Sequence, residues 1–184
     1  MNAIISKEFV IQSTIEAMAN IRNTRFYKSE RGYQGEFHRL IASLLNIEGL
    51  ENDGIILENE YQKRLIIHRT RQRPDLIMHI PREITNDSPD ENNITVWAFK
   101  IQSNLDNALN DFAKLEEMFE YLNYSYGIFI NISSSDNFLS HYSGQYNDRI
   151  FSFATKIRSD VIEILSGEYK EEDVVNRLFQ YKIG

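Results

Sequence analysis

Two ionisable side chains interrupt segments that otherwise have the apolar character of β-strands. Asp75 follows Pro74 at the start of RPDLIMHIP, and Lys100 lies near the end of ITVWAFKIQ. An aspartate and a lysine on adjacent strands can form a structural ion pair. They can also line a cleft, where charged side chains take part in catalysis. From these two residues alone, the structural ion pair is the default interpretation.

Alternation along ITVWAFKIQ predicts which side chains share a face of that strand. Ala98, Lys100 and Gln102 fall on one face, whereas Trp97 and Phe99 fall on the other. A lysine and a glutamine near the end of an apolar strand are costly to bury unless they are paired or hydrated. The pattern therefore predicts a cleft on the lysine face.

The order of these segments resembles the PD-(D/E)XK nuclease superfamily. Pro74–Asp75 is followed by strand, hairpin, strand and then Ala98–Phe99–Lys100–Ile101–Gln102, with Ala98 where the family motif carries an acid. The helix expected over 104–122 and the strand YGIFINIS behind it are similar to the family's order of elements, so the resemblance covers roughly residues 32 to 133. It implies a restriction-endonuclease-like fold: α/β, a three-layer sandwich with a central mixed sheet flanked by helices.

The resemblance also implies an activity and a set of site residues. The activity is phosphodiester hydrolysis by water activated at Mg²⁺, for which Mn²⁺ can substitute. Asp75 would bridge the metal ions, the Phe99 backbone carbonyl would be a further ligand, and Lys100 would orient or deprotonate the attacking water. Gln102 would help to position the substrate. Glu36 is similar to an acidic residue that many members carry on the helix before the first strand.

The alanine at position 98 has three interpretations. It can be an engineered replacement of a glutamate, or the acid can have migrated, with Glu36 supplying the missing oxygen. Alternatively, the domain has lost catalysis and kept binding. The leading hypothesis is a metal-dependent nuclease acting on DNA in restriction, phage defence or repair, with RNA a weaker candidate. The alternative is a non-catalytic nuclease-like module that binds nucleic acid or a protein partner, and a third hypothesis is a structural domain in which Asp75 and Lys100 merely pair.

Charge is unevenly distributed along the chain. The 20 basic and 27 acidic residues give a formal net charge of −7, which argues against a general polyanion binder. Weak DNA binding by this domain alone is expected, so a homodimer or a larger assembly is a candidate arrangement. Basic residues gather in KRLIIHRTRQR, which is either a phosphate-facing patch or a solvated strand edge and turn. They are Lys63, Arg64, Arg69, Arg71 and Arg73.

Length and composition indicate one globular unit. The 184 residues, 42% of them hydrophobic, suffice for one core, so we expect a single domain over residues 1–184. The absence of cysteine excludes disulfides and thiolate-bound zinc and fits a reducing cytosol. No apolar run approaches the roughly 20 residues of a membrane span, which predicts a soluble, cytoplasmic protein without membrane contact.

The elements that must position Asp75 and Lys100 follow from hydrophobic periodicity. Helices are expected over 7–21, 32–46 and 104–122. Strands are expected in GIILENEYQKRLII, RPDLIMHIP, ITVWAFKIQ and YGIFINIS, the last as a fully buried strand that pairs in parallel after the third helix. Two closing helices are predicted over Arg149–Ile157 and Glu171–Tyr181.

Overall fold

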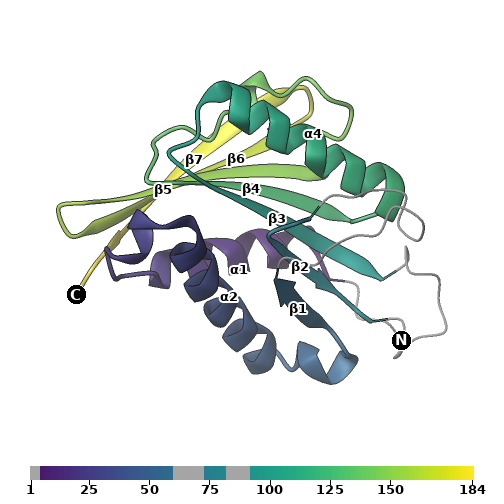
Figure 1. The fold of residues 1–184 in the computed structure, drawn as a ribbon, viewed down its shortest axis with the longest axis horizontal. Coiled ribbons are helices and arrows are strands. Elements are labelled where there is room, and N and C mark those ends of the chain that lie inside the picture. Colours follow the sequence, from purple (N-terminus) through teal and green to yellow (C-terminus); the bar gives the residue numbers. More distant parts are fainter. Residues whose placement is uncertain (1–4, 60–72, 82–91) are drawn as a thin grey trace.

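The computed structural model describes residues 5–59, 73–81 and 92–184, in which seven strands form one mixed sheet with helices on both faces (Figure 1). The order of strands across the sheet is their order in the chain. The helices are α1 (Lys7–Asn20), α2 (Glu30–Ile47) and α4 (Leu105–Leu122), with short 3₁₀ helices at Phe26–Lys28, Leu50–Asp53 and Leu139–His141. The strands are β1 (Ile56–Asn59), β2 (Leu76–His79), β3 (Asn93–Ile101), β4 (Tyr126–Ile132), β5 (Ile150–Arg158), β6 (Val161–Lys170) and β7 (Asp173–Lys182).

The sheet changes from antiparallel to parallel pairing and back. β1, β2 and β3 pair antiparallel, β4 and β5 join in parallel, and β6 and β7 close the sheet antiparallel. The parallel pairing predicted for the strand, helix, strand unit of β3, α4 and β4 is confirmed. The three predicted helices, the α/β class and the mixed sheet are confirmed as well.

Two apolar cores lie on opposite faces of the sheet. In Figure 1, α1 and α2 lie on one face and α4 lies on the other. Trp97 and Phe99 belong to the core under α1 and α2, whereas Val96 belongs to the core under α4, with Ala98 packed against it. The alternation predicted for these residues of β3 is therefore confirmed.

Local sequence explains why α4 lies so close to the sheet. Its N-terminus is capped by Asn104, whose side-chain oxygen accepts the N–H of Asn107 at 2.9 Å. At its other end it packs on Gly127 of β4, where a Cβ atom would lie 2.5 Å from Phe119 Cζ. A side chain at position 127 would displace the buried Phe119 ring, so the glycine lets this ring pack directly on β4.

The predicted closing helices over Arg149–Ile157 and Glu171–Tyr181 are wrong, because these segments form β5 and β7. β6, which lies between them, has no counterpart among the predicted elements. Together they build two long hairpins, with Arg158 paired to Val161 and Lys170 paired to Asp173. Each hairpin therefore has a two-residue loop, which strongly favours strands over helices on either side.

The hairpin loops lack the glycine that marks such turns in a sequence. Ser159 and Asp160 have φ values of 46° and 62°, as the two central residues of a type I′ turn require. Glu171, in the second loop, has a φ of 58°. Non-glycine residues in this region store strain of order 1–3 kcal/mol each, so these loops are held by the strands that they connect.

Replacing Ser159–Asp160 by Asn–Gly is expected to stabilise the protein by about 1 kcal/mol, because this pair adopts the type I′ turn with the least strain. Thermal unfolding followed by circular dichroism should show a rise of about 2–4 °C in the midpoint. The control is Asn–Ala, which keeps a Cβ atom in the left-handed region and should lower the midpoint. An equal rise for both variants would contradict the turn assignment.

Part of the sequence prediction lies outside the described residues. The predicted strand GIILENEYQKRLII overlaps β1 up to Asn59, and the rest of that segment lies outside the described residues. The polar segment that begins at Arg82 lies outside them as well. Within the parts of the chain that the structure describes, no helix has the length and apolar character needed to cross a membrane.

Candidate active site

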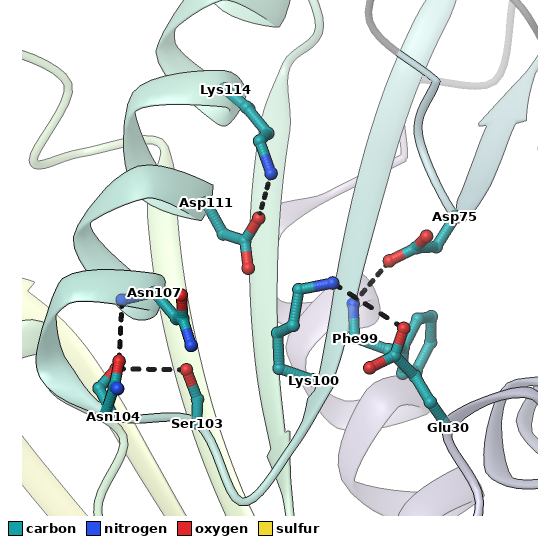
Figure 2. A network of polar contacts seen from close by, with 9 residues as sticks. All are labelled: Glu30, Asp75, Phe99, Lys100, Ser103, Asn104, Asn107, Asp111 and Lys114. Atoms are coloured by element: carbon teal, nitrogen blue, oxygen red, sulfur yellow. Dashed lines mark hydrogen bonds and ion pairs between the residues drawn. The ribbon is translucent and has the colours of Figure 1, made fainter.

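Antiparallel pairing of β2 with β3 brings Asp75 beside the lysine end of β3. Leu76 is in register with Trp97, so the residue before Leu76 reaches the level of Ala98. The Phe99 N–H donates a hydrogen bond of 2.8 Å to Asp75 Oδ2, which fixes the carboxylate against β3 (Figure 2). Because N–H and C=O of one strand residue point to the same side, the Phe99 carbonyl also faces the Asp75 side of β3.

A cavity of about 140 Å³ lies where β2 begins and β3 ends, under α4. This is several times the roughly 10–15 Å³ that one water molecule requires. The structure therefore brings together four of the residues predicted from the sequence, Arg73, Asp75, Ala98 and Lys100. The lining of the cavity also includes Asp111 and Lys114.

Lys100 is paired with an acid from the opposite layer of the fold. Its Nζ lies 3.6 Å from Oε1 of Glu30, the first residue of α2 (Figure 2). The helix begins there because the Ser29 side chain caps it by accepting the Gly32 N–H. Both paired side chains are 34% exposed, so Lys100 remains accessible to a ligand that enters from solvent.

Asp111 reaches the same cavity from α4. It is only 3% exposed, and its Oδ1 accepts a hydrogen bond of 2.7 Å from Lys114 Nζ. Its Oδ2 is buried and has no hydrogen-bond partner. A buried carboxylate oxygen without a partner is costly, which distinguishes Asp111 from an acid in an ordinary surface ion pair.

The charges around Asp75 act on it in opposite directions. Burial raises the pKa of its carboxyl above the ordinary value of 3.8, and the nearby carboxylates of Glu30 and Asp111 raise it further. The Phe99 N–H and the Lys100 ammonium lower the pKa but do not cancel the effect of burial. The cavity therefore disfavours the ionised form of Asp75.

A residue of α2 positions the backbone of Asp75. Gln34, which is buried, donates a hydrogen bond from its side-chain amide to the Asp75 carbonyl oxygen. The start of β2 is thereby attached to the helix layer on one side, while Asp75 Oδ2 is attached to β3 on the other. Such double attachment holds a carboxylate in one geometry.

The structure does not bring Glu36 or Gln102 into this cavity. Glu36 instead binds Arg39 one helical turn away, with contacts of 2.9 and 2.7 Å that lower the pKa of Glu36. β3 ends at Ile101, and Gln102 is exposed with a φ of 49°. Strand alternation no longer applies where the backbone turns, which is why Gln102 does not line the cavity with Lys100. The acid of α2 that does reach the site is Glu30, through its ion pair with Lys100.

The predicted nucleic-acid segment is described only at its end. Arg73 lines the cavity next to Asp75. The other four basic residues of the segment lie outside the described residues. They are Lys63, Arg64, Arg69 and Arg71.

The donors in the cavity fit a magnesium ion. In residues 5–59, 73–81 and 92–184, no three histidine, aspartate or glutamate side chains gather closely enough to hold a metal. Mg²⁺, however, usually keeps several waters and takes one or two carboxylates together with substrate phosphates. Asp75 and Asp111 are two carboxylates of that kind, and Asp111 Oδ2 is without a hydrogen-bond donor.

Sequence reasoning missed Glu30, Gln34, Asp111 and Lys114. A signal for Asp111 exists: it falls on the apolar face of α4, three residues after the buried Ala108, where an acid is unexpected. For Glu30, the preceding Ser29 marks a helix start, but nothing in the sequence indicates that this start meets the end of β3.

The fold and the cavity define an α/β protein with a carboxylate- and lysine-lined cavity at one end of its mixed sheet. Comparison of the chain with protein-family models, with curated proteins and with solved structures finds no significant match. Its function is therefore inferred from its own residues and their geometry.

Proposed function

We propose that the protein is a metal-dependent nuclease with a restriction-endonuclease-like fold that hydrolyses phosphodiester bonds of DNA. The observation that supports this most is that Asp75, Ala98 and Lys100 share one cavity at the start of β2 and the end of β3. The core order of helix α2, strands β1 to β3, helix α4 and parallel strand β4 agrees with the order expected from the sequence resemblance.

The residues of the cavity have distinct roles in this proposal. A bound Mg²⁺, or Mn²⁺ in its place, supplies Lewis acidity toward the phosphate. Asp75 provides a carboxylate oxygen that is already fixed by the Phe99 N–H. Lys100 offers a proton-handling and charge-neutralising group at Nζ, held in place by Glu30. Arg73, on the cavity wall, adds positive charge next to the phosphate.

The local charge gives a phosphate little net attraction by itself. The carboxylates of Glu30, Asp75 and Asp111 at the cavity offset the positive charges of Arg73, Lys100 and Lys114. DNA binding should therefore be weak without a divalent ion and should tighten when one is added. Restriction, phage defence and repair are all processes in which such an activity is used.

The test is cleavage of supercoiled and linear DNA with Mg²⁺ or Mn²⁺ by the unaltered protein, by Asp75→Asn and by Lys100→Met. We expect each variant to lose about 10²-fold or more in rate, the scale of removing a charge-stabilising or proton-transfer group. Lys170→Met, which removes a half-exposed lysine from β6, is the matched control and should cleave like the unaltered protein.

One pattern of results would favour the alternative function, a non-catalytic nuclease-like module that binds nucleic acid or a protein partner. If neither the unaltered protein nor Ala98→Glu cleaves DNA or RNA under any divalent ion, the nuclease proposal is wrong. Retention of DNA affinity in the same samples, with a steep salt dependence, would then identify a non-catalytic nucleic-acid-binding module. Loss of that affinity as well would point to a protein partner.

A further inference from the structure

Ala98 leaves the cavity one acid short on the strand, but the helix opposite delivers another. Asp111 projects from α4 toward the same space as Asp75, and Figure 2 shows the two carboxylates on either side of the Lys100 side chain. The two acids come from layers that pack directly on each other, because Phe112 and Leu115 of α4 belong to the core between helix and sheet.

An ion pair with Lys114 does not account for the placement of Asp111. The Lys114 side chain is half exposed, whereas the Asp111 side chain is 5% exposed, and the pair consists of one contact between Lys114 Nζ and Asp111 Oδ1. It uses Oδ1 alone, whereas Oδ2 stays buried without a partner. An acid kept at a buried position with one unsatisfied oxygen indicates a ligand that the protein side chains do not replace.

We propose that Asp111 and Asp75 together supply the carboxylate oxygens of a divalent-cation site, with Asp111 taking the place of the acid that is absent at position 98. This inference rests on the proposed function and names the second metal ligand of that site. It differs from the sequence-based expectation that Glu36 supplies this oxygen, because Glu36 is bound to Arg39.

The surroundings of the two acids agree with cation binding. Asp75 and Asp111 line the same cavity, so a cation between them would relieve the repulsion of the two carboxylates. Each acid is also held in a fixed direction, Asp75 by the Phe99 N–H and Asp111 by Lys114. Two carboxylates leave the remaining positions of an octahedral ion to water and substrate phosphate, as Mg²⁺ prefers.

The experiment is a calorimetric titration of Mn²⁺ into the 184-residue protein and its variants, without nucleic acid. Asp111→Asn is expected to weaken Mn²⁺ binding by at least about tenfold, the lower end of what altering a metal site costs. Asp106→Asn removes the same charge from the same helix outside the cavity and should bind like the unaltered protein. Lys114→Met leaves both carboxylates in place and should bind Mn²⁺ at least as tightly as the unaltered protein.

A second variant keeps the inference testable if Asp111→Asn is poorly folded. The double variant Asp111→Asn with Ala98→Glu returns a carboxylate to the cavity from the strand and should recover the Mn²⁺ affinity that Asp111→Asn loses. Thermal unfolding of each variant establishes that a folded protein is titrated.

The outcomes separate this inference from the proposed function. If Asp75→Asn abolishes Mn²⁺ binding but Asp111→Asn has no effect, Asp111 is not a ligand and the nuclease proposal still stands. If neither substitution changes Mn²⁺ affinity, or if the unaltered protein binds none, both proposals fail. Equal losses for Asp111→Asn and Asp106→Asn would show a general charge effect and would also overturn the assignment.

Discussion

In the Asp111→Asn background, Ala98→Glu is expected to raise the rate of DNA cleavage by roughly 10²-fold over Asp111→Asn alone, the scale of one well-placed charged group in an active site. Position 98 lies at the level of Asp75 across the antiparallel pair, and its side chain lines the cavity. A glutamate there would extend into about 140 Å³ of space rather than into the core. It would add a carboxylate oxygen next to the one that the Phe99 N–H already fixes.

Two controls make this prediction specific. Ala98→Gln introduces nearly the same volume without charge and should leave the cleavage rate unchanged. Lys100→Met in the Ala98→Glu background should remove the gain, because the added ligand is useful only with the group that handles the proton. A gain in rate that Lys100→Met does not reduce would contradict the assignment of Lys100 to this site.

The second large effect concerns stability and its dependence on pH. Asp75→Asn is expected to raise the thermal midpoint at neutral pH in the presence of a chelator, since the pKa of Asp75 is raised in the folded protein. A carboxyl with a raised pKa binds its proton more tightly when folded, so its ionisation destabilises the fold. Asparagine keeps an oxygen that can accept the Phe99 N–H but carries no charge.

The pH window of this effect follows from the direction of the shift. Below the ordinary carboxyl pKa of 3.8, Asp75 is protonated in both states and the variant should have no advantage. As the pH rises from 3.8 through the raised folded value, the unaltered protein loses stability relative to Asp75→Asn, and above that value the difference is constant. Midpoints measured by circular dichroism between pH 3 and 8 test this.

A matched control separates the cavity from general charge effects. Asp148→Asn removes a carboxylate from an exposed position and should show no comparable gain at neutral pH. Addition of Mn²⁺ should stabilise the unaltered protein and leave Asp75→Asn unaffected, because only the former retains the ligand. A variant that is less stable than the unaltered protein at neutral pH would refute the raised pKa. The expected gain in stability of Asp75→Asn would be an example of the trade-off between stability and activity that is common at active sites.

The sequence by itself determined the three helices α1, α2 and α4, the strand that bears Lys100 and the pairing around that strand. Each buried element leaves a pattern within its own residues: apolar positions on one helical face over 104–122, and a continuous apolar run in β4. This local pattern was sufficient to predict the type of each element. The same holds for the alternation of Trp97 and Phe99 against Ala98 and Lys100. The predicted closeness of Asp75 and Lys100 followed from two strands joined in series.

The tertiary structure alone decided β5 to β7 and the composition of the cavity. The hairpin loops contain three non-glycine residues in left-handed conformations, Ser159, Asp160 and Glu171, which their residue types do not predict. These conformations persist because the many hydrogen-bonded pairs of the two hairpins outweigh the local strain. Asp111 and Glu30 meet the end of β3 from opposite layers. The apolar face of α4 marks Asp111 as unusual, but no local pattern shows that either acid reaches this strand. The closeness of Asp75 and Lys100 therefore follows from the order of neighbouring strands in the sequence. The acids that surround these two residues, Asp111 and Glu30, reach them only through the packing of the helix layers on the sheet.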